Sequence, residues 1–446
     1  MSPAMTAIHR RPPADTPSGW MPPSELAVIG SDPAPAQADW AVVGAGFTGL
    51  AAARRLAELN PDKRVVLIDA MPVGWGASGR NAGFVIDLPH KFDLDGDDAG
   101  RMRRVVRLNR AALADLQRQV EAGAIDCDWS PVGKLQAAIA DTGLKGMRTF
   151  ARILDSLDEP YRLLSREDLH RITGTRHYAG AIHTPGCVLM NPARLVRGLA
   201  RTLPANVTVL DGCPVSAIAA EGSSHLISLR RRGVPIRIRA GRVIAAMNAY
   251  TSEFGWLRDR MVPIATFASL SAPLDDAQMA IFGGQTDWGL TPADAGGTTL
   301  RMTRDRRLLV RNRFDYLGAF GASDRTLDRV RDSHRLALRR RWPELADLAF
   351  ESTWGGVCAL SRNRVSYFGQ MAPGVWGSNT HNGVGVARGT ISGRLLAEAA
   401  CGHDSDLLAD MQAVSGQPVR NPPRPFVGLG VKTRLRYEAW KSRKEI

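Results

Sequence analysis

No stretch of this 446-residue sequence approaches the roughly eighteen consecutive apolar residues that a membrane-spanning helix needs. Residues 1–11 also lack the apolar stretch of a signal peptide, so we expect a cytoplasmic protein without a membrane span. The five cysteines are scattered and none belongs to a Cys-X-X-Cys pair. These absences argue against a disulfide framework and a zinc site, and they leave an ordinary globular composition long enough for two or three domains.

Acidic residues are in deficit, with 44 against 58 basic residues and a formal net charge of +14. Such a charge occurs in proteins that bind nucleic acid, anionic lipid or acidic substrates. The basic residues recur in four separate segments, however, at 101–110, 230–242, 335–341 and 432–444. Arginine also heavily outnumbers lysine, a bias that a GC-rich genome produces without any binding role. We therefore do not expect a nucleic-acid partner.

The segment that begins at Trp40 is the most informative part of the chain. A short apolar strand is followed by the pattern G-X-G-X-X-G at Gly44, Gly46 and Gly49, and then by an alanine-rich helix expected at 50–59. Gly44 permits the tight turn, Gly46 lets the backbone approach a pyrophosphate, and Gly49 lets the helix pack on the strand. The N-terminus of the helix faces the phosphates with its positive end.

An acidic residue follows where a dinucleotide-binding unit needs one. A second buried strand is expected at 65–68 and leads into Asp69, twenty residues after Gly49. A carboxylate in this place accepts hydrogen bonds from ribose hydroxyls. The segment therefore predicts a bound dinucleotide.

The rest of the chain predicts two architectures. Residues 1–37 carry eight prolines and suggest an extended surface arm. Between residues 261 and 316 apolar and polar residues alternate, as an antiparallel sheet requires. Ser165 and Asp168 form a capping box, and Asn191 caps a helix over 192–203. Further helices are expected at 97–122, 142–157 and 327–342, and further strands at 134–139, 207–210, 215–219, 226–229, 235–238, 242–247 and 375–378.

Four separated motifs occur in one order: VVGAGFTG at 42–49, GASGRNAG at 76–83, VIAAMNAYT at 243–251, and NGVGVARGTISGRLLAE at 382–398. With them, residues 38–403 resemble the D-amino-acid-oxidase-like family of FAD-dependent oxidoreductases, which includes glycine, sarcosine and γ-glutamylputrescine oxidases. The second and third motifs are most similar to the γ-glutamylputrescine-oxidase-like branch.

This resemblance implies an α/β fold, α+β overall, in which a Rossmann-like FAD-binding domain is interleaved with an antiparallel-sheet substrate domain. We expect the FAD-binding domain to comprise residues 38–90, 187–250 and 355–404. The substrate domain would comprise 91–186 and 251–354, and a basic tail would occupy 405–446.

The resemblance also implies which residues meet the cofactor. The C-terminal motif would present a helix N-terminus to the flavin and stabilise its anionic reduced form. The residues expected to bind FAD are Gly44, Gly46, Phe47, Thr48, Gly49, Asp69, Ala70, Ser78, Gly79, Arg80, Asn81, Gly83, Val215, Asn248, Gly383, Val384, Gly385 and Val386.

By the same resemblance the protein is expected to use FAD to oxidise a C–N bond of a primary or secondary amine or amino acid to an imine, which water hydrolyses. Asn81 and His381 are the candidate catalytic residues, and Arg313 and Tyr316 are weaker candidates on the substrate sheet. Cys358, in VCALSRNRVSYFG, falls where sarcosine-oxidase-like members attach flavin through a thioether, so it is a candidate for covalent attachment.

Two departures leave the electron acceptor open. Val384 stands where many members have a histidine between the glycines, and no lysine occurs between Lys145 and Lys432 to match the one that activates oxygen in sarcosine-oxidase-like members. Oxygen or another acceptor is thus compatible with the sequence. The alternatives are a dehydrogenase of the same family that reduces a quinone or carrier protein, an RNA-modifying flavoprotein, and a nicotinamide-dependent dehydrogenase. The downstream glycine-rich motifs favour FAD over nicotinamide.

Overall fold

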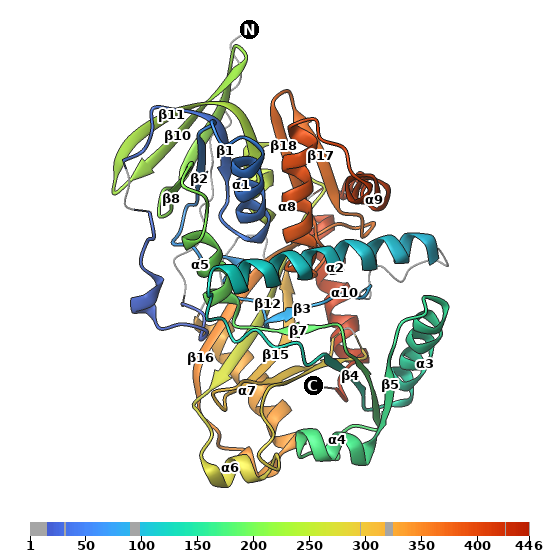
Figure 1. Ribbon diagram of the computed structural model, residues 1–446. Coiled ribbons are helices and arrows are strands. Elements are labelled where there is room, and N and C mark those ends of the chain that lie inside the picture. Colours follow the sequence, from blue (N-terminus) through green and yellow to red (C-terminus); the bar gives the residue numbers. More distant parts are fainter. Residues whose placement is uncertain are drawn as a thin grey trace.

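Two eight-stranded sheets, one above the other in Figure 1, organise the protein. The computed structural model describes residues 16–30, 33–89, 99–294, 296–316, 324–423 and 425–445. A small antiparallel ribbon lies between the two sheets in this view and joins β3 (Phe84–Val85) to β7 (Val188–Leu189).

The first sheet grows from the βαβ unit that the glycine pattern predicts. The helix α1 (Phe47–Leu59) connects the parallel strands β1 (Gln37–Val43) and β2 (Val65–Ile68). The order along the sheet is β17 (Tyr367–Ala372), β18 (Val375–Asn379), β11 (Val234–Ala245), β1, β2 and β8 (Val207–Leu210). A further ribbon of β9 (Val215–Glu221) and β10 (Ser224–Arg231) pairs with the first half of β11.

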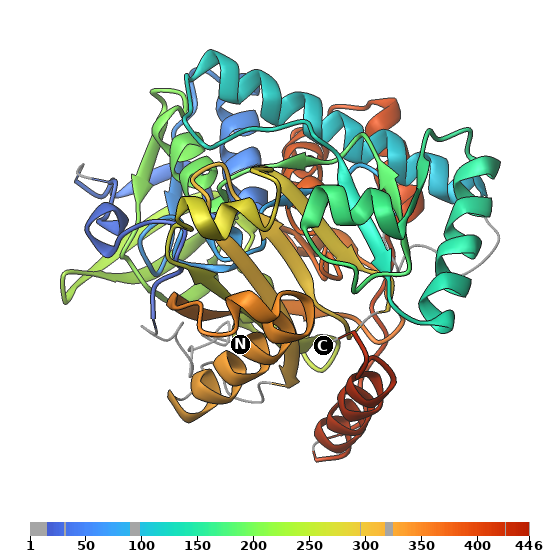
Figure 2. The ribbon, with the colours of Figure 1, turned by 90° about the horizontal axis from the view of Figure 1, so that it is seen from below.

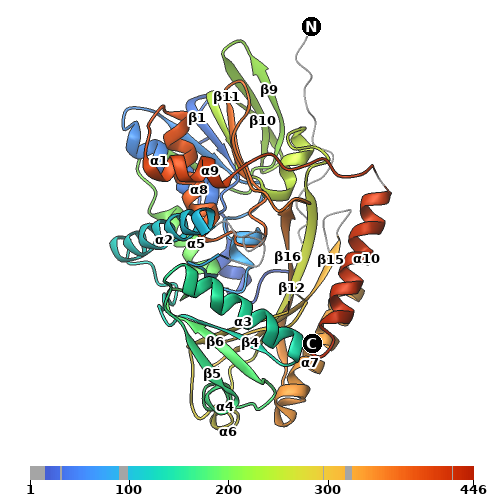
Figure 3. The ribbon, with the colours of Figure 1, turned by 90° about the vertical axis from the view of Figure 1, so that its right-hand side faces the viewer.

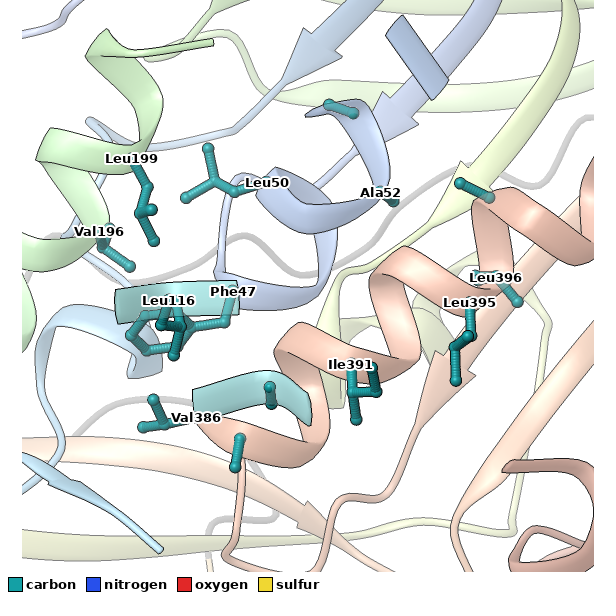
Figure 4. Close-up of a cluster of buried hydrophobic side chains, with 14 of the residues drawn as sticks. Phe47, Leu50, Ala52, Leu116, Val196, Leu199, Val386, Ile391, Leu395 and Leu396 are labelled. Atoms are coloured by element: carbon teal, nitrogen blue, oxygen red, sulfur yellow. The ribbon is translucent and has the colours of Figure 1, made fainter. Parts of the chain in front are cut away.

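Five helices cover one face of this sheet and form the largest core. They are α1, α2 (Ala99–Ala122), α5 (Pro192–Arg201), α8 (Ala387–Ala400) and α9 (Asp406–Val414). Figure 4 shows aliphatic and aromatic side chains of this core, including Phe47, Leu116 and Ile391. A methyl group added at Gly393 would lie 2.0 Å from the Thr48 carbonyl oxygen, so α8 crosses α1 at a distance that only glycine permits.

The second sheet has the order β16 (Phe350–Leu360), β12 (Val262–Ser271), β15 (Leu308–Tyr316), β14 (Thr299–Met302), β13 (Trp288–Pro292), β4 (Lys134–Ala138), β6 (Gly180–Thr184) and β5 (Arg162–Ser165). All pairs are antiparallel except β13 with β4. The fully buried Trp342, which follows α7 (Asp324–Arg341), belongs to the hydrophobic core that packs against this sheet.

The remaining helices are α3 (Asp141–Ser156), α4 (Arg166–Thr173), α6 (Asp276–Ala280) and α10 (Phe426–Lys441). The short 3-10 turns are η1 (Pro23–Leu26), η2 (Ala77–Gly79), η3 (Asn248–Phe254) and η4 (Pro343–Leu345).

Most expected elements are confirmed. Both predicted N-terminal caps are present, since Ser165 and Asp168 form a capping box and Asn191 accepts from the Arg194 amide. The strands β2 and β8 have the predicted bounds. One prediction was wrong: the strands expected at 235–238 and 242–247 are the single strand β11, because its first half pairs with β10 and its second half with β1.

Three boundaries also differ from expectation. The helix α1 starts at Phe47 rather than at residue 50, directly at the glycine turn. The boundary expected at 355 falls inside β16, which pairs with β12 along its length. The region expected to be a basic tail, 405–446, contains α9 and α10.

The proline-rich start of the chain is also more integrated than an arm on the surface. Residues 1–15 lie outside the described part, but Trp20 and Leu26 are buried, and the Trp20 ring packs edge-on against Trp354 with centroids 6.4 Å apart. Among the described residues no helix is both long and apolar enough to cross a membrane. The same residues contain no cluster of His, Cys, Asp and Glu suited to a metal ion.

Candidate cofactor and substrate site

A cavity of about 1420 Å³ is lined by residues of both sheets. At one end lie the turn after β1, the residues after β2, the loop that contains η2 and the start of α8. At the other end lie β12, β15 and β16, with α10 along the wall. The four sequence motifs, which occur between residues 42 and 398, therefore meet around one space.

The glycine turn after β1 has the geometry that the sequence predicts. Gly44 has a φ of +106°, which favours glycine, and its amide donates to the Ile68 carbonyl at 2.7 Å. A methyl group at Gly49 would lie 1.7 Å from the Gly44 carbonyl oxygen, so only glycine fits at this third position of α1. A methyl group at Gly46 would lie 2.7 Å from Ser78 Oγ, and this hydroxyl accepts from the Phe47 amide at 3.1 Å.

Asp69 already holds the turn through its two carboxylate oxygens. One oxygen accepts from the Ala45 amide at 2.7 Å and the other from the Met71 amide at 2.9 Å. Desolvation raises the pKa of Asp69 to about 6, although these backbone hydrogen bonds oppose the shift. Asp69 lines the cavity together with Ala70 and Val215, beside the turn where ribose hydroxyls are expected.

Two polar side chains of the second motif are engaged with backbone. Asn81 donates to the Ser78 carbonyl at 2.7 Å and accepts from the Gly83 amide at 2.9 Å. The Arg80 guanidinium donates to the carbonyls of Trp75, Gly355 and Thr16 at 2.6 to 2.8 Å. Both side chains thus shape the loop, and Arg80 also ties it to β16, while Asn81 keeps a place on the cavity wall.

The fourth motif leaves open space at the start of α8. Gly383 has a φ of +90°, and an added methyl group at Gly383 or Gly385 would meet no atom within 4 Å. Val384 and Val386 are buried on either side of Gly385, and Figure 4 shows Val386 at the start of α8 near Phe47. Free backbone amides at this helix N-terminus can therefore approach a ligand in the cavity.

His381 lies between the first and fourth motifs. Its Nε2 is 3.2 Å from Thr48 Oγ1, whereas its buried Nδ1 has no hydrogen-bond partner among the described residues. Burial, helped by the nearby Arg388 charge, lowers the pKa of His381 to about 3. The imidazole is thus neutral at physiological pH and is a weak base.

Where the second sheet lines the cavity, the structure shows a residue that the sequence reasoning missed. Arg311 of β15 lines the cavity, where Nε donates to Thr266 Oγ1 at 2.8 Å and Nη1 donates to Thr299 Oγ1 at 3.3 Å. Its guanidinium also lies over the Phe314 ring, 4.9 Å from the centroid. Burial lowers its pKa, and no carboxylate lies within ion-pair distance among the described residues.

Of the two weaker sequence candidates on this strand, Arg313 also lines the cavity and Tyr316 does not. Arg313 has a φ of +59° and is skipped in the pairing between β12 and β15, so it is a bulged residue whose side chain is exposed. Tyr316 does not line the cavity, and its ring lies against Gly428 of α10. Arg311 and Arg313 are two residues apart, so the alternating pattern of the strand places both on the same face. The pattern does not indicate the bulge that separates them.

Cys358 lies on β16 and lines the cavity, opposite Ile264 in the pairing with β12. Its thiol donates to the Ile264 carbonyl at 3.5 Å. Burial raises the pKa of Cys358 to about 11 despite the nearby Arg311. The sulfur is therefore a thiol rather than the thiolate that attachment to flavin requires.

Most of the residues expected to bind FAD line this cavity. The exceptions are Gly49, Gly79 and Gly83, whose α-carbons face neighbouring protein atoms and have no room for a side chain. Asn248 lines the cavity and also links the sheets, because its amide donates to the Val357 carbonyl at 2.8 Å. The volume, the open glycines of the fourth motif and the unpartnered His381 Nδ1 fit a large bound cofactor.

Comparison with known proteins identifies that cofactor. A family model described as FAD dependent oxidoreductase matches residues 39–399. The chain belongs to this family. It is an FAD-dependent oxidoreductase, as the resemblance in sequence predicted.

Relatives in this family match over most of their length. The chain is 28% identical over 385 residues to the probable oxidoreductase OrdL of Rhizobium meliloti (strain 1021), covering 84% of this chain and 86% of the relative. It is 26% identical over 406 residues to the gamma-glutamylputrescine oxidoreductase of Escherichia coli (strain K12), covering 88% and 91%. Its fold is similar to that of glycine oxidase from Geobacillus kaustophilus, with a TM-score of 0.71 at 17% identity over 87% of this chain and 100% of that one.

Proposed function

We propose that this FAD-dependent oxidoreductase oxidises the C–N bond of a primary or secondary amine or amino acid to an imine, and that its preferred substrates carry a carboxylate that pairs with Arg311. The imine is then hydrolysed by water. The observation that carries the proposal is the half-buried Arg311 guanidinium on the cavity wall, held by two threonine hydroxyls and by no acidic residue of the described chain.

Electrostatics support an anionic ligand at this position. A cation removed from water is costly unless an opposite charge accompanies it, and burial lowers the pKa of Arg311 for this reason. Threonine hydroxyls supply hydrogen bonds but no charge. A substrate carboxylate would supply the missing charge and accept charge-assisted hydrogen bonds from the guanidinium.

The bound FAD supplies the electron-accepting chemistry, so the protein must hold and desolvate the substrate. No strong base faces the cavity among the candidate residues, because the pKa of His381 is about 3 and the Asn81 amide is engaged by backbone. The amine must therefore enter in its neutral form. Arg311 would fix the far end of the substrate and so orient its α-hydrogen.

Two of the similar proteins agree with a substrate of this class. One is named gamma-glutamylputrescine oxidoreductase and the other glycine oxidase, and both names contain an amine that bears a carboxylate. The proposal that Arg311 recognises the carboxylate rests on the geometry of β15 alone.

The test is anaerobic bleaching of the flavin by pairs of amines that differ only in a carboxylate. Glycine with methylamine, and γ-aminobutyrate with butylamine, are suitable pairs within a wider amine and polyamine panel. We expect faster bleaching by the carboxylated member of at least one pair. Bleaching by hydroxy acids or RNA while every amine is inert would refute the proposal.

The electron acceptor requires a separate measurement. The sequence has no lysine between Lys145 and Lys432, and Lys432 of α10 lies at the outer wall of the cavity. After bleaching, admission of air with peroxide detection is compared with addition of a quinone or a dye. Slow reoxidation of the flavin by air together with fast reoxidation by quinone would identify the enzyme as a dehydrogenase.

A further inference from the structure

The C-terminal helix α10 carries an exposed apolar stripe, of which only Phe426 also lines the cavity. Phe426, Leu429, Tyr437 and Trp440 are exposed by 66%, 68%, 51% and 61%. Phe426, Tyr437 and Trp440 are the only large aromatic side chains that are exposed in the described part of the chain. At 3.6 residues per turn, the four side chains fall within an arc of about 80°. They therefore form one stripe along the helix rather than scattered exposed residues.

Cations border this stripe on both sides. By the same helical geometry, Lys432 and Arg436 lie along one edge, and Arg434 and Lys441 lie along the other. Arg443 and Lys444 follow the last turn and are also exposed. The only acidic side chain on the helix, Glu438, pairs with Arg434. An exposed apolar stripe with basic flanks complements the apolar interior and the anionic headgroups of a bilayer surface.

The helix is held firmly at both ends, so the stripe is presented in a fixed orientation. Before it, the Asn421 amide donates to the Asp259 carbonyl at 2.6 Å. After it, Ser442 and Glu445 are buried, and they accept from the amides of Gly296 and Asp294. Figure 3 shows α10 running along β15 at one side of the molecule, and Figure 2 shows it projecting from the body.

We propose that the outer face of α10 binds the surface of an anionic phospholipid bilayer. Phe426, Leu429, Tyr437 and Trp440 would enter the headgroup region, and the flanking lysines and arginines would pair with lipid phosphates. The enzyme lies on the membrane without crossing it, with the wall of the cavity that α10 forms directed toward the lipid. This inference does not depend on the proposed substrate.

Charge distinguishes this occupant from a second copy of the chain. A two-fold pairing of α10 helices would bring like charges together, since each copy carries the same six cations on and just after the helix and one acidic residue already in an ion pair. The whole chain repeats this bias with a net charge of +14. An anionic bilayer complements both the charge and the apolar stripe, at about 1 kcal/mol for each cation near its surface.

The test is sedimentation of the flavin-loaded protein with vesicles. One preparation contains phosphatidylcholine alone and the other contains phosphatidylcholine with roughly one third phosphatidylglycerol. We expect binding to the second preparation only, and weaker binding as salt rises. The triple variant Lys441→Gln, Arg443→Gln, Lys444→Gln should lower the partition coefficient by roughly a hundredfold, because three cations are removed.

A second triple variant, Leu429→Ser, Tyr437→Ser, Trp440→Ser, removes three apolar side chains that do not line the cavity, and it should lower binding at least about tenfold. The matched control is Leu163→Ser with Val234→Ser, which removes apolar side chains exposed by 66% and 61% on β5 and β11. The control should bind as the parent does. The flavin absorbance of each variant verifies its fold.

Three results would overturn the proposal. The first is equal binding to both vesicle preparations, and the second is an α10 serine variant that binds as well as the parent. The third is a concentration-dependent dimer in lipid-free ultracentrifugation that the serine variant abolishes, which would assign this face to a second copy of the chain.

Discussion

Replacing Arg311 by methionine would separate a role in substrate recognition from a role in the fold. The side chain makes two hydrogen bonds, to Thr266 and Thr299, and it is half-buried without a counter-charge among the described residues. Methionine keeps most of the side-chain volume while it removes the charge. The expected consequences for stability and for catalysis are different in size.

The effect on stability should be small because two terms oppose each other. Removing a half-buried cation without a counter-charge relieves part of the desolvation cost, which is several kcal/mol for a fully buried ion. Losing two hydrogen bonds from a charged donor costs about 1.5–3 kcal/mol each. The substrate carboxylate would lose its partner in the variant, and nothing compensates for this loss. We therefore expect the transition state of a carboxylated amine to lose about 3 kcal/mol of stabilisation, so that kcat/KM falls roughly a hundredfold.

The assay compares steady-state kinetics of parent and variant on a carboxylated amine and on its decarboxylated partner, alongside thermal unfolding of both proteins. For the decarboxylated amine we expect less than about a threefold change. Arg313→Met is the matched comparison, because this arginine is two residues away but bulged and exposed. Equal losses on both amines, or a selective loss in Arg313→Met instead, would refute the assignment to Arg311.

Three further predictions concern the cofactor. Gly46→Val should yield colourless protein, because even the first added carbon would lie 2.7 Å from Ser78 Oγ and the branch would fill the approach to the pyrophosphate; full flavin occupancy in this variant would contradict the turn assignment. FAD affinity of the apoprotein should rise as pH passes about 6, because desolvation holds the pKa of Asp69 near that value and the ionised carboxylate is the better acceptor for ribose hydroxyls. Fluorescence titration of FAD should show this step in the parent and not in Asp69→Asn. Acid precipitation should leave the yellow colour in the supernatant, because burial raises the pKa of Cys358 to about 11; colour in the pellet that Cys358→Ala abolishes would establish a covalent link instead.

The cofactor half of the fold was predictable because its signals are local. The strand, the glycine turn and the helix of the first unit lie within about thirty residues, and both the φ of +106° at Gly44 and the close contact at Gly49 arise inside that unit. Gly49 illustrates this, since its α-carbon faces the carbonyl of Gly44. The caps at Ser165 and Asn191 were equally local and equally predictable.

The substrate half depends on contacts that the sequence does not display. The alternation of β15 identified a strand, but the bulge at Arg313 arises from its pairing with β12, about fifty residues away in sequence. The helix α10 was missed for a different reason. Three prolines precede it, and Gly428 and Gly430 each lower helix propensity by about 1 kcal/mol, so packing against β15 and anchoring at both ends must stabilise it.

The interleaving of the two sheets has a consequence for how such enzymes diversify. In the first sheet the strands β18, β11, β1 and β2 lie side by side in that order. The sheet is therefore assembled from three parts of the chain that are far apart in sequence: β1 with β2, then β11, then β18. The strands of the second sheet are encoded in the intervals between those parts. No single cut in the gene separates one sheet from the other, and exchange of whole segments between relatives would break both. Replacement of a module is therefore a poor route to a new substrate preference in this fold, whereas point changes at residues that line the cavity leave both sheets intact.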